Sequence, residues 1–378
     1  MVRFRDDISI FSSKVLLLAA VLAVGFLWVL IPFDRHAHSS APSPTKLWSI
    51  DLSKDGDFKQ RLSIEEVVLT PPSIRFLSNS KILCDFYSRE IGVTDKQLPA
   101  NSYHVLEIDA NHATIDRKLD FIGFVDNYHI FPVADGGFLV FADDKLQKFN
   151  NQFAIESTYP TPRVKEQSYD HWLADVAPDG RTVLLYSHRS GEKQATWTWL
   201  RTTDLSVIKS LQAMAVGSIK GSGDAVIFAR AGESELWRDG KTTVLCNLCV
   251  PWFLSSDMLF LDKQHSYAIQ TISGKVLGTG DLDVEADNFT RSAQTTRIAF
   301  DTGHYNGKGF PIQADFDSIS SKTLVIDWTT NKPIAEVDVN EAAGHPSAGL
   351  KQMSLALSPD GKYLAILLHH TLNLYLLP

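Results

Sequence analysis

The stretch that decides the fold is LALSPDGKYLAILLHH at residues 355–370, in which two apolar runs flank Pro359, Asp360 and Gly361. A second stretch, LADVAPDGRTVLLYSHR at residues 173–189, has the same design. Proline presets the backbone angle of a tight turn, and glycine adopts the positive φ that other residues resist. Apolar runs on both sides of such a turn predict two antiparallel β-strands joined as a hairpin.

Weaker copies of this hairpin recur along the chain as SIRFLSNSKILCDFY, HIFPVADGGFLVFADD, VGSIKGSGDAVIFAR, VPWFLSSDMLFLDK and RSAQTTRIAFDTG. The seven turns are marked by Asn79, Asp135, Asp179, Gly223, Ser256, Thr295 and Asp360. Successive markers are 56, 44, 44, 33, 39 and 65 residues apart, a mean near 47. Several hairpins are followed by a second pair of strands, as in YHVLEIDANHATI, TWTWLRTTDLSVI and TLVIDWTTNKPIAEV. Each repeat therefore supplies four strands.

Four strands in about 40 to 50 residues are the size of one β-propeller blade. We therefore predict an all-β fold, a β-propeller of about seven blades over residues 47–378. The strand LWSIDL at 47–52 opens this region unpartnered, and the last repeat stops after its third strand, LNLYLLP at 372–378. Pairing the N-terminal and C-terminal strands would complete one blade and remove an exposed sheet edge. The uneven spacings at 79–135 and 295–360 leave six and eight blades as alternatives.

The hairpins APDGRTVLLY and SPDGKYLAIL resemble the Pro-Asp-Gly repeats of WD40-like propellers of the TolB and YVTN type. The resemblance covers residues 47–378 as architecture, with two repeats that match well and five that match in outline. It implies a bacterial, exported propeller that acts as a binding scaffold. The Trp-Asp dipeptide of eukaryotic WD40 blades does not occur in the chain.

The N-terminal region contains a long uncharged run, VLLLAAVLAVGFLWVLIPF at residues 15–33. As a helix it would rise about 28 Å, close to the thickness of a bilayer core of about 30 Å. We predict one N-terminal transmembrane helix, which would attach the protein to a membrane. Residues 1–14 would form a cytoplasmic tail, and residues 34–46 would form a linker to the propeller.

The charges that flank this run indicate its orientation. Arg3, Arg5 and Lys14 precede it and Arg35 follows it, a bias that places the N-terminus in the cytoplasm and the propeller outside. The alternative is a signal peptide, whose apolar core usually has about 7 to 15 residues. Cleavage near Ala41 would then leave a secreted or periplasmic protein, but the length of the run favours the anchor.

The charge of the chain narrows the choice of partners. The formal net charge is −8, and residues 1–46 carry a net +2, so the remainder carries −10. An acidic domain without clusters of lysine and arginine is a poor binder of phosphate backbones. Nucleic acid is therefore excluded as an expected partner, and an unknown protein or a small-molecule ligand remains.

Two polar segments are candidates for ligand binding. His171, Trp172 and Asp175 lie where the chain enters an inner strand, which in a propeller is near the central opening. Asp301 and His304 belong to the polar stretch DTGHYNGKG, in the longest repeat, which we interpret as a loop. Long loops on rigid scaffolds commonly carry recognition. The alternatives are a Trp172 packed between blades and a surface loop without function.

Signatures of catalysis and cofactor binding are absent from the sequence. HExxH, GxSxG, GxxxxGK[ST] and GxGxxG do not occur, so we predict no catalytic residue, cofactor or metal site. Cys246 and Cys249 form a CxxC between two strand-like segments, without a second CxxC. A thioredoxin-type pair or a zinc site needs a helix N-terminus or further ligands. A local disulfide and two unlinked cysteines therefore remain as interpretations.

Two functions follow from these observations. The first is a membrane-anchored binding or protein-interaction scaffold, suggested by the anchor and the lack of a catalytic signature. The second is a propeller enzyme, a hydrolase or lyase with side chains from several blades at the central opening, because such sites have no local motif. Three or more ionisable side chains converging in one central pocket would favour the enzyme. A narrow or apolar channel would favour the scaffold.

Overall fold

The computed structural model describes residues 41–58, 72–89, 101–123, 129–142, 145–161, 171–188, 192–216, 218–230, 232–263, 265–282, 288–306, 318–342, 353–368 and 370–378. The expected membrane segment at 15–33 and the tail at 1–14 lie outside these ranges. Within them, no helix is long and apolar enough to cross a bilayer. Residues Pro42–Pro378 form one compact unit, in which β-strands predominate.

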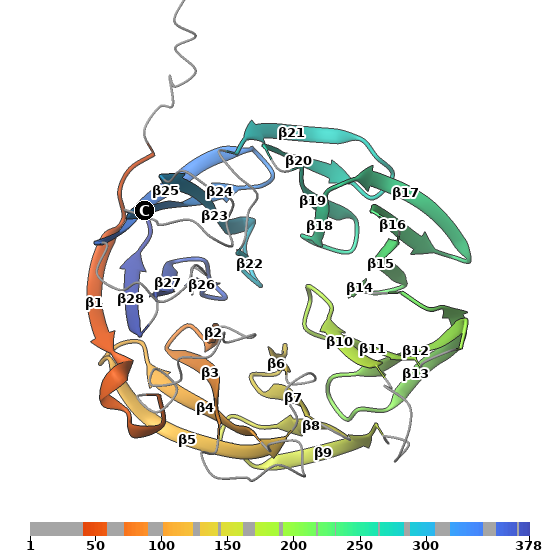
Figure 1. The fold of residues 1–378 in the computed structure, drawn as a ribbon, viewed down its shortest axis with the longest axis horizontal. Helices are drawn as coiled ribbons and strands as arrows, with labels where there is room; N and C mark the ends of the chain where they lie inside the picture. The colour runs from red at the N-terminus through yellow and green to blue at the C-terminus, as the bar shows by residue number, and fades with distance from the viewer. Residues whose placement is uncertain are drawn as a thin grey trace, which may run out of the picture. The chain divides into compact units, whose positions relative to one another are not determined.

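The strands form seven four-stranded antiparallel sheets, which we number as blades in chain order (Figure 1). Blades 1 and 2 contain β2 (Ser73–Ser78), β3 (Lys81–Arg89), β4 (Asn101–Asp109), β5 (Thr114–Gly123), β6 (His129–Pro132), β7 (Phe138–Ala142), β8 (Lys145–Phe149) and β9 (Ile155–Pro160). Blades 3 and 4 contain β10 (His171–Val176), β11 (Thr182–His188), β12 (Gln194–Arg201), β13 (Val207–Met214), β14 (Ile219–Ser222), β15 (Ala225–Arg230), β16 (Glu233–Arg238) and β17 (Lys241–Asn247).

The remaining blades complete the ring. Blades 5 and 6 contain β18 (Val250–Phe253), β19 (Met258–Asp262), β20 (Ser266–Thr271), β21 (Val276–Asp281), β22 (Phe289–Arg291), β23 (Arg297–Asn306), β24 (Ser318–Asp327) and β25 (Lys332–Ala342). Blade 7 contains β26 (Met353–Leu357), β27 (Tyr363–Leu368), β28 (Thr371–Leu376) and β1 (Thr45–Asp51). The prediction of an all-β, seven-bladed propeller is thus confirmed.

Blade 7 joins the two ends of the folded chain. β1 pairs antiparallel with β28, from Thr45 opposite Leu376 to Asp51 opposite Thr371. The Leu52 N–H also donates to the His370 carbonyl at 2.8 Å, in the 3-10 turn η1 (Leu52–Lys54) that follows β1. The predicted closure by N-terminal and C-terminal strands is confirmed.

Each of the seven marker residues lies in the turn between the first and second strand of its blade. The uneven spacings have a structural cause, because blades 1 and 6 have longer strands than the others. β5 has 10 residues and β25 has 11, whereas the corresponding β9 and β21 have 6 each. The repeats therefore differ in length because their strands do, while each repeat still forms one blade.

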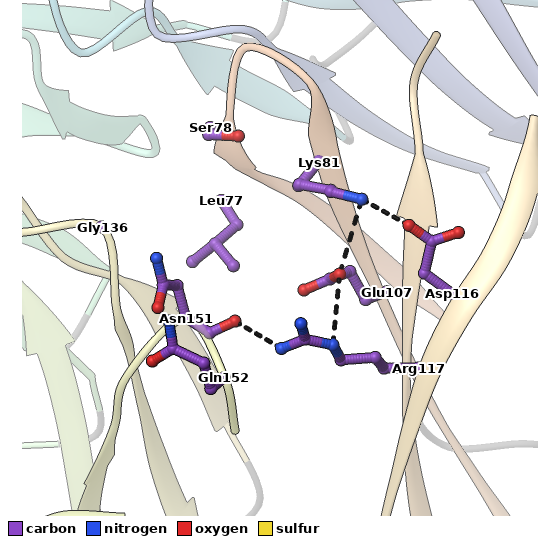
Figure 2. A pocket seen from close by; sticks show the side chains of 9 residues that line it. All are labelled: Leu77, Ser78, Lys81, Glu107, Asp116, Arg117, Gly136, Asn151 and Gln152. Carbon is purple, nitrogen blue, oxygen red and sulfur yellow. Dashed lines mark hydrogen bonds and ion pairs between the residues drawn. The ribbon is translucent and has the colours of Figure 1, made fainter. Parts of the chain in front are cut away.

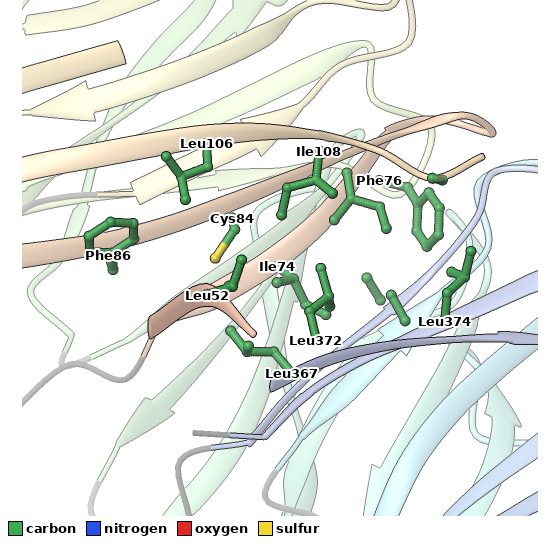
Figure 3. Packing of buried hydrophobic residues seen from close by; sticks show 14 of the residues in the cluster. Leu52, Ile74, Phe76, Cys84, Phe86, Leu106, Ile108, Leu367, Leu372 and Leu374 are labelled. Atoms are coloured by element: carbon green, nitrogen blue, oxygen red, sulfur yellow. The ribbon is translucent and has the colours of Figure 1, made fainter. Parts of the chain in front are cut away.

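The core consists of apolar layers between adjacent blades. On β11, Val183 and Leu185 face the layer shared with blade 2, whereas Leu184 and Tyr186 face the layer shared with blade 4. Successive side chains of a strand point to opposite faces of the sheet. Because a blade is covered on both faces by its neighbours, its inner strands need apolar residues at successive positions. Figure 3 shows one such layer, in which Leu372 and Leu374 of blade 7 pack with Ile74 of blade 1.

Candidate functional site

The first strands of all seven blades line a central cavity of about 820 Å³. One lining residue of each blade stands three or four positions before that blade's turn marker. We call these seven residues the central layer; they are Arg75, Phe131, Asp175, Lys220, Trp252, Arg291 and Ala356. Equivalent positions on equivalent strands thus bring together side chains that are far apart in the chain.

Three ionisable groups of the central layer come from blades 3, 4 and 6. Asp175 Oδ2 accepts the backbone N–H of Gly221 at 2.7 Å. Lys220 Nζ donates to the Pro251 carbonyl at 2.7 Å, and Arg291 Nη1 donates to the Phe253 carbonyl at 3.0 Å. Each bond crosses from one blade to the next, so the cluster both faces the cavity and ties blades 3 to 6 together.

Burial shifts the pKa values of these groups. It raises the pKa of Asp175, against the Gly221 N–H, Arg291 and Lys220, which lower it. It lowers the pKa of Lys220 to about 8, with Asp175 acting in the opposite direction and Arg291 in the same direction. Burial also lowers the pKa of Arg291, while Asp175 and the exposed Asp179 raise it. Clusters of shifted groups in a cavity are typical of functional sites.

Aromatic side chains form the wall beside Lys220. The Lys220 ammonium lies 4.1 Å from the centroid of the Trp252 ring, within the range of a cation–π interaction. Trp252 is stacked on Phe289, with 5.0 Å between ring centroids and 22° between planes. The lysine is therefore held against the cavity wall by the ring and by the Pro251 carbonyl.

Among the residues proposed for binding, the structure describes the side chains of Asp175 and Asp301. Asp175 lies in the central layer. His171 and Trp172 begin the same strand, β10, and their side chains are outside the described part of the chain. Asp301 is fully buried in blade 6 and accepts the Asn288 backbone N–H at 2.8 Å, so it is not a loop residue.

The interpretation of 301–309 as a polar loop is wrong for its first six residues. β23 extends to Asn306, and His304 is opposite Ser320 of β24 in the ladder. The physical reason is the length of blade 6, whose ladder continues through polar residues because cross-strand hydrogen bonds of the backbone do not depend on the side chain. Residues 307–309 lie outside the described ranges.

The sequence did not identify Lys220 and Arg291 as candidate binding residues. Both stand on first strands of weak hairpins, in the tetrapeptide IKGS of β14 and the tripeptide FTR of β22. The available signal was the position of each before its turn marker, four residues for Arg291 before Thr295, as for Asp175 before Asp179, and three residues for Lys220 before Gly223.

A second pocket, of about 520 Å³, lies between blades 1 and 2 (Figure 2). Its charged side chains neutralise one another. Lys81 pairs with Asp116, with Asp109 at 3.1 Å and with Glu107 at 3.7 Å. The hydrogen bond to Asp116 is the main cause that raises the pKa of Lys81 to about 12. The two cations of this pocket, Lys81 and Arg117, are therefore both paired with carboxylates of blade 1.

A third cluster, in blade 1, has the residue types of a metal site. The ligand atoms of Asp57, His104 and Asp120 lie within 4.8 Å of one another, and His104 Nδ1 is 2.7 Å from Asp120 Oδ1. The Lys118 ammonium pairs with Asp57 and lies 3.9 Å from Asp120. A metal ion would have to displace this lysine, so the cluster suits an internal ion pair better than a metal.

The two cysteines of the CxxC face each other across the connection from β17 to β18. Their Cα atoms are 5.9 Å apart, and the structure joins their sulfur atoms as a disulfide. Leu248, between them, has φ +52° and is 68% exposed. Oxidation of Cys246 and Cys249 in the protein stays a prediction.

No family model and no curated protein sequence matches the chain. Among solved structures, the WD40 domain of Neurospora crassa Pan2 matches with a TM-score of 0.50 and 8% identity, over 90% of this chain and 98% of that one. The C-terminal WD40 domain of Sif2 has a TM-score of 0.48 and 10% identity, over 89% and 99%. BamB from Moraxella catarrhalis has a TM-score of 0.39 and 13% identity, over 88% of this chain and 99% of that one. The similarity to the Pan2 domain establishes the propeller fold alone.

Proposed function

We propose that this chain is a membrane-tethered β-propeller scaffold that binds a partner protein or ligand at its central opening. Residues 15–33 would anchor it, with the N-terminus in the cytoplasm and the propeller on the outer side of the membrane. The Pro-Asp-Gly hairpins of blades 3 and 7 support a place among exported bacterial propellers. Cleavage of the N-terminal segment would instead release the propeller into the periplasm or the medium.

The central layer carries the part of this proposal that concerns binding at the opening. It places Asp175, Lys220 and Arg291 around a cavity of about 820 Å³, within the usual size of ligand sites of about 300 to 1,000 Å³. Propeller folds host many functions, so the argument rests on the cavity and its side chains rather than on the fold.

A photo-crosslinking amino acid placed in the cavity would test the proposal. Phe131 of the central layer is replaced by benzoylphenylalanine in the full-length protein, and Val207, which is 50% exposed on outer strand β13, receives it as the control. We expect a discrete crosslinked partner from position 131 that is lost when Lys220→Met and Arg291→Met are added. Equal crosslinking from both positions, or none from position 131, would contradict a binding site in the opening.

A propeller enzyme is the second candidate, and the same cluster favours it. Three ionisable side chains converge in one cavity, and a lysine with a pKa of about 8 is partly neutral near that pH, where it can accept a proton. Lys220→Arg keeps a positive charge but does not titrate in this range. In a panel of hydrolase and lyase substrates, turnover lost in Lys220→Arg would favour the enzyme. Absence of turnover in the unmodified protein would favour the scaffold.

A further inference from the structure

In the central layer, the wall formed by blades 3 to 6 carries two cations and one carboxylate. Lys220 and Arg291 face the cavity together with Asp175, whose charge acts on both of them. The second carboxylate of the lining, Asp179, is exposed, so solvent screens its charge. Across the cavity, Arg75 is 3.2 Å from Asp85, so its charge is already matched. A partly desolvated positive charge in a chain of net charge −8 is costly unless an anion compensates it.

The two cations also have hydrogen-bond donors to spare. A lysine ammonium has three N–H donors and an arginine guanidinium has five. Among the described residues, Lys220 donates to the Pro251 carbonyl and Arg291 to the Phe253 carbonyl, one bond each. These bonds hold the terminal nitrogens Lys220 Nζ and Arg291 Nη1 at the cavity wall, so their other N–H donors are preorganised for a ligand.

We infer that the central cavity binds an oxyanion, the carboxylate or phosphate group of a ligand, between Lys220 and Arg291. The inference rests on the proposed function, because it places the ligand's charged group in the same opening. Asp175 is the carboxylate whose charge raises the pKa of both cations, and it is held in place by the Gly221 N–H at 2.7 Å. Its negative charge also opposes the anion, so the site binds more weakly than two cations alone would.

Proton uptake offers a separate test of the same assignment. Burial lowers the pKa of Lys220 to about 8, Asp175 raises it and Arg291 lowers it. An anion beside Lys220 adds a second negative charge and moves this pKa upward. Binding at pH 8 to 8.5 would therefore take up a fraction of a proton per anion bound, whereas binding well below pH 8 would take up none at this lysine.

Calorimetry on the full-length protein in mild detergent tests the inference with three probes. Inorganic phosphate and succinate carry the two oxyanions, and succinamide is the uncharged control of succinate. We expect phosphate, succinate or both to bind, which identifies the preferred oxyanion, and succinamide not to bind. Titration at pH 8.3 in buffers of different ionisation enthalpy should show proton uptake. Equal binding of succinate and succinamide, or binding of none of the probes, would overturn the inference.

Matched variants locate the site. Lys220→Met and Arg291→Met should each weaken binding about tenfold or more, since a charge-assisted pair is lost. Asp175→Asn keeps an acceptor for the Gly221 N–H and should tighten binding about threefold at pH 6.5, where Lys220 stays charged. Lys220→Arg should keep affinity within about threefold but abolish proton uptake, and it covers the case in which the methionine variants do not fold. Unchanged affinity in both methionine variants, or weaker binding in Asp175→Asn, would overturn the inference.

The two proposals can fail separately. If a partner crosslinks at position 131 but no oxyanion binds, the oxyanion site is refuted and the scaffold stands. If an oxyanion binds with the expected variant pattern but no partner crosslinks, the scaffold is refuted and the site stands.

Discussion

At the scale of the residue, Lys220 combines three constraints. It contacts the Trp252 ring, donates to a carbonyl of the next blade and shares the cavity with Arg291. A lysine in this position is costly to bury charged, and the lowered pKa expresses that cost. The residue is therefore expected to reduce stability while it serves the cavity, as functional residues often do.

The pH dependence of unfolding should show this cost. The pKa of Lys220 is about 8 in the folded protein and near the ordinary 10.5 when unfolded. Between these values the unfolded chain holds a proton that the folded protein has released, so the unfolding free energy rises with pH. Below pH 8, Lys220 is protonated in both the folded and the unfolded protein, so the full free-energy cost of burying its charge remains. Lys220→Met should remove this rise, which amounts to on the order of 2 kcal/mol.

Urea unfolding of fragment 42–378 at pH 7, 8.5 and 10 measures the effect. Lys241→Met, which removes an exposed lysine of β17, gives the background for loss of a surface charge. A gap between Lys220→Met and the unmodified protein that stays constant from pH 7 to pH 10 would show that Lys220 is not desolvated.

At the scale of the element, neighbouring blades are joined by hydrogen bonds between their first strands and between the turns that follow these strands. Besides the bonds of the central layer, the Ile74 N–H donates to Ser354 Oγ, and the Leu357 N–H donates to Thr290 Oγ1. The Ala134 N–H of blade 2 donates to the Gly180 carbonyl of blade 3. Short polar bridges thus accompany the apolar layers and align equivalent strands around the cavity.

Gly180, in the Pro-Asp-Gly turn of blade 3, should be hard to replace. Its φ is +68°, and an added Cβ would lie 2.8 Å from the Ala134 backbone nitrogen of blade 2. Gly180→Ala is expected to lower the unfolding free energy by about 2 to 3 kcal/mol, from backbone strain and from displacement of the neighbouring turn. Gly223→Ala is the control, because Gly223 has φ +55° and open space around it. It should cost about 1 kcal/mol, and equal losses in urea unfolding would argue against the contact between blades.

β1 is the second element whose removal should be informative. The Trp48 indole N–H donates to the Ala110 carbonyl of blade 1 at 2.6 Å, and Trp48 and Ile50 pack on the layer between blades 7 and 1. A fragment 52–378 would lose these contacts and expose β28 as a free sheet edge. Relative to fragment 42–378, it should lose about 4 kcal/mol or more of unfolding free energy and associate on gel filtration. Equal stability and a monomeric fragment 52–378 would show that the ring does not depend on β1.

At the scale of the whole molecule, the architecture was readable from the sequence and the site was not. Turn residues such as Gly180 and Gly361 adopt a positive φ, which local sequence indicates. A strand whose blade is covered on both faces by neighbouring blades has a continuous run of apolar residues. These two patterns together made it possible to count the blades. Lys220 and Arg291 line the same cavity because of the order of the blades in the ring and the position of each residue on its strand. Local sequence patterns do not reveal either of these. Asp175 was proposed because it lies, with His171 and Trp172, where the chain enters an inner strand near the central opening.

Attachment to a membrane is the prediction that concerns the whole chain. The uncharged run at 15–33 is long enough to span a bilayer and precedes the compact unit Pro42–Pro378. A transmembrane helix resists extraction at alkaline pH, whereas a soluble propeller does not. We therefore expect the full-length protein to stay in the membrane pellet after an alkaline wash, and fragment 42–378 to stay in the supernatant. Leu22→Arg with Phe26→Arg should release the full-length protein, because charged residues at the centre of a spanning helix cost about 2.5 to 3.5 kcal/mol each. A full-length product that is soluble and begins near Ala41 would show instead that the segment is a cleaved signal.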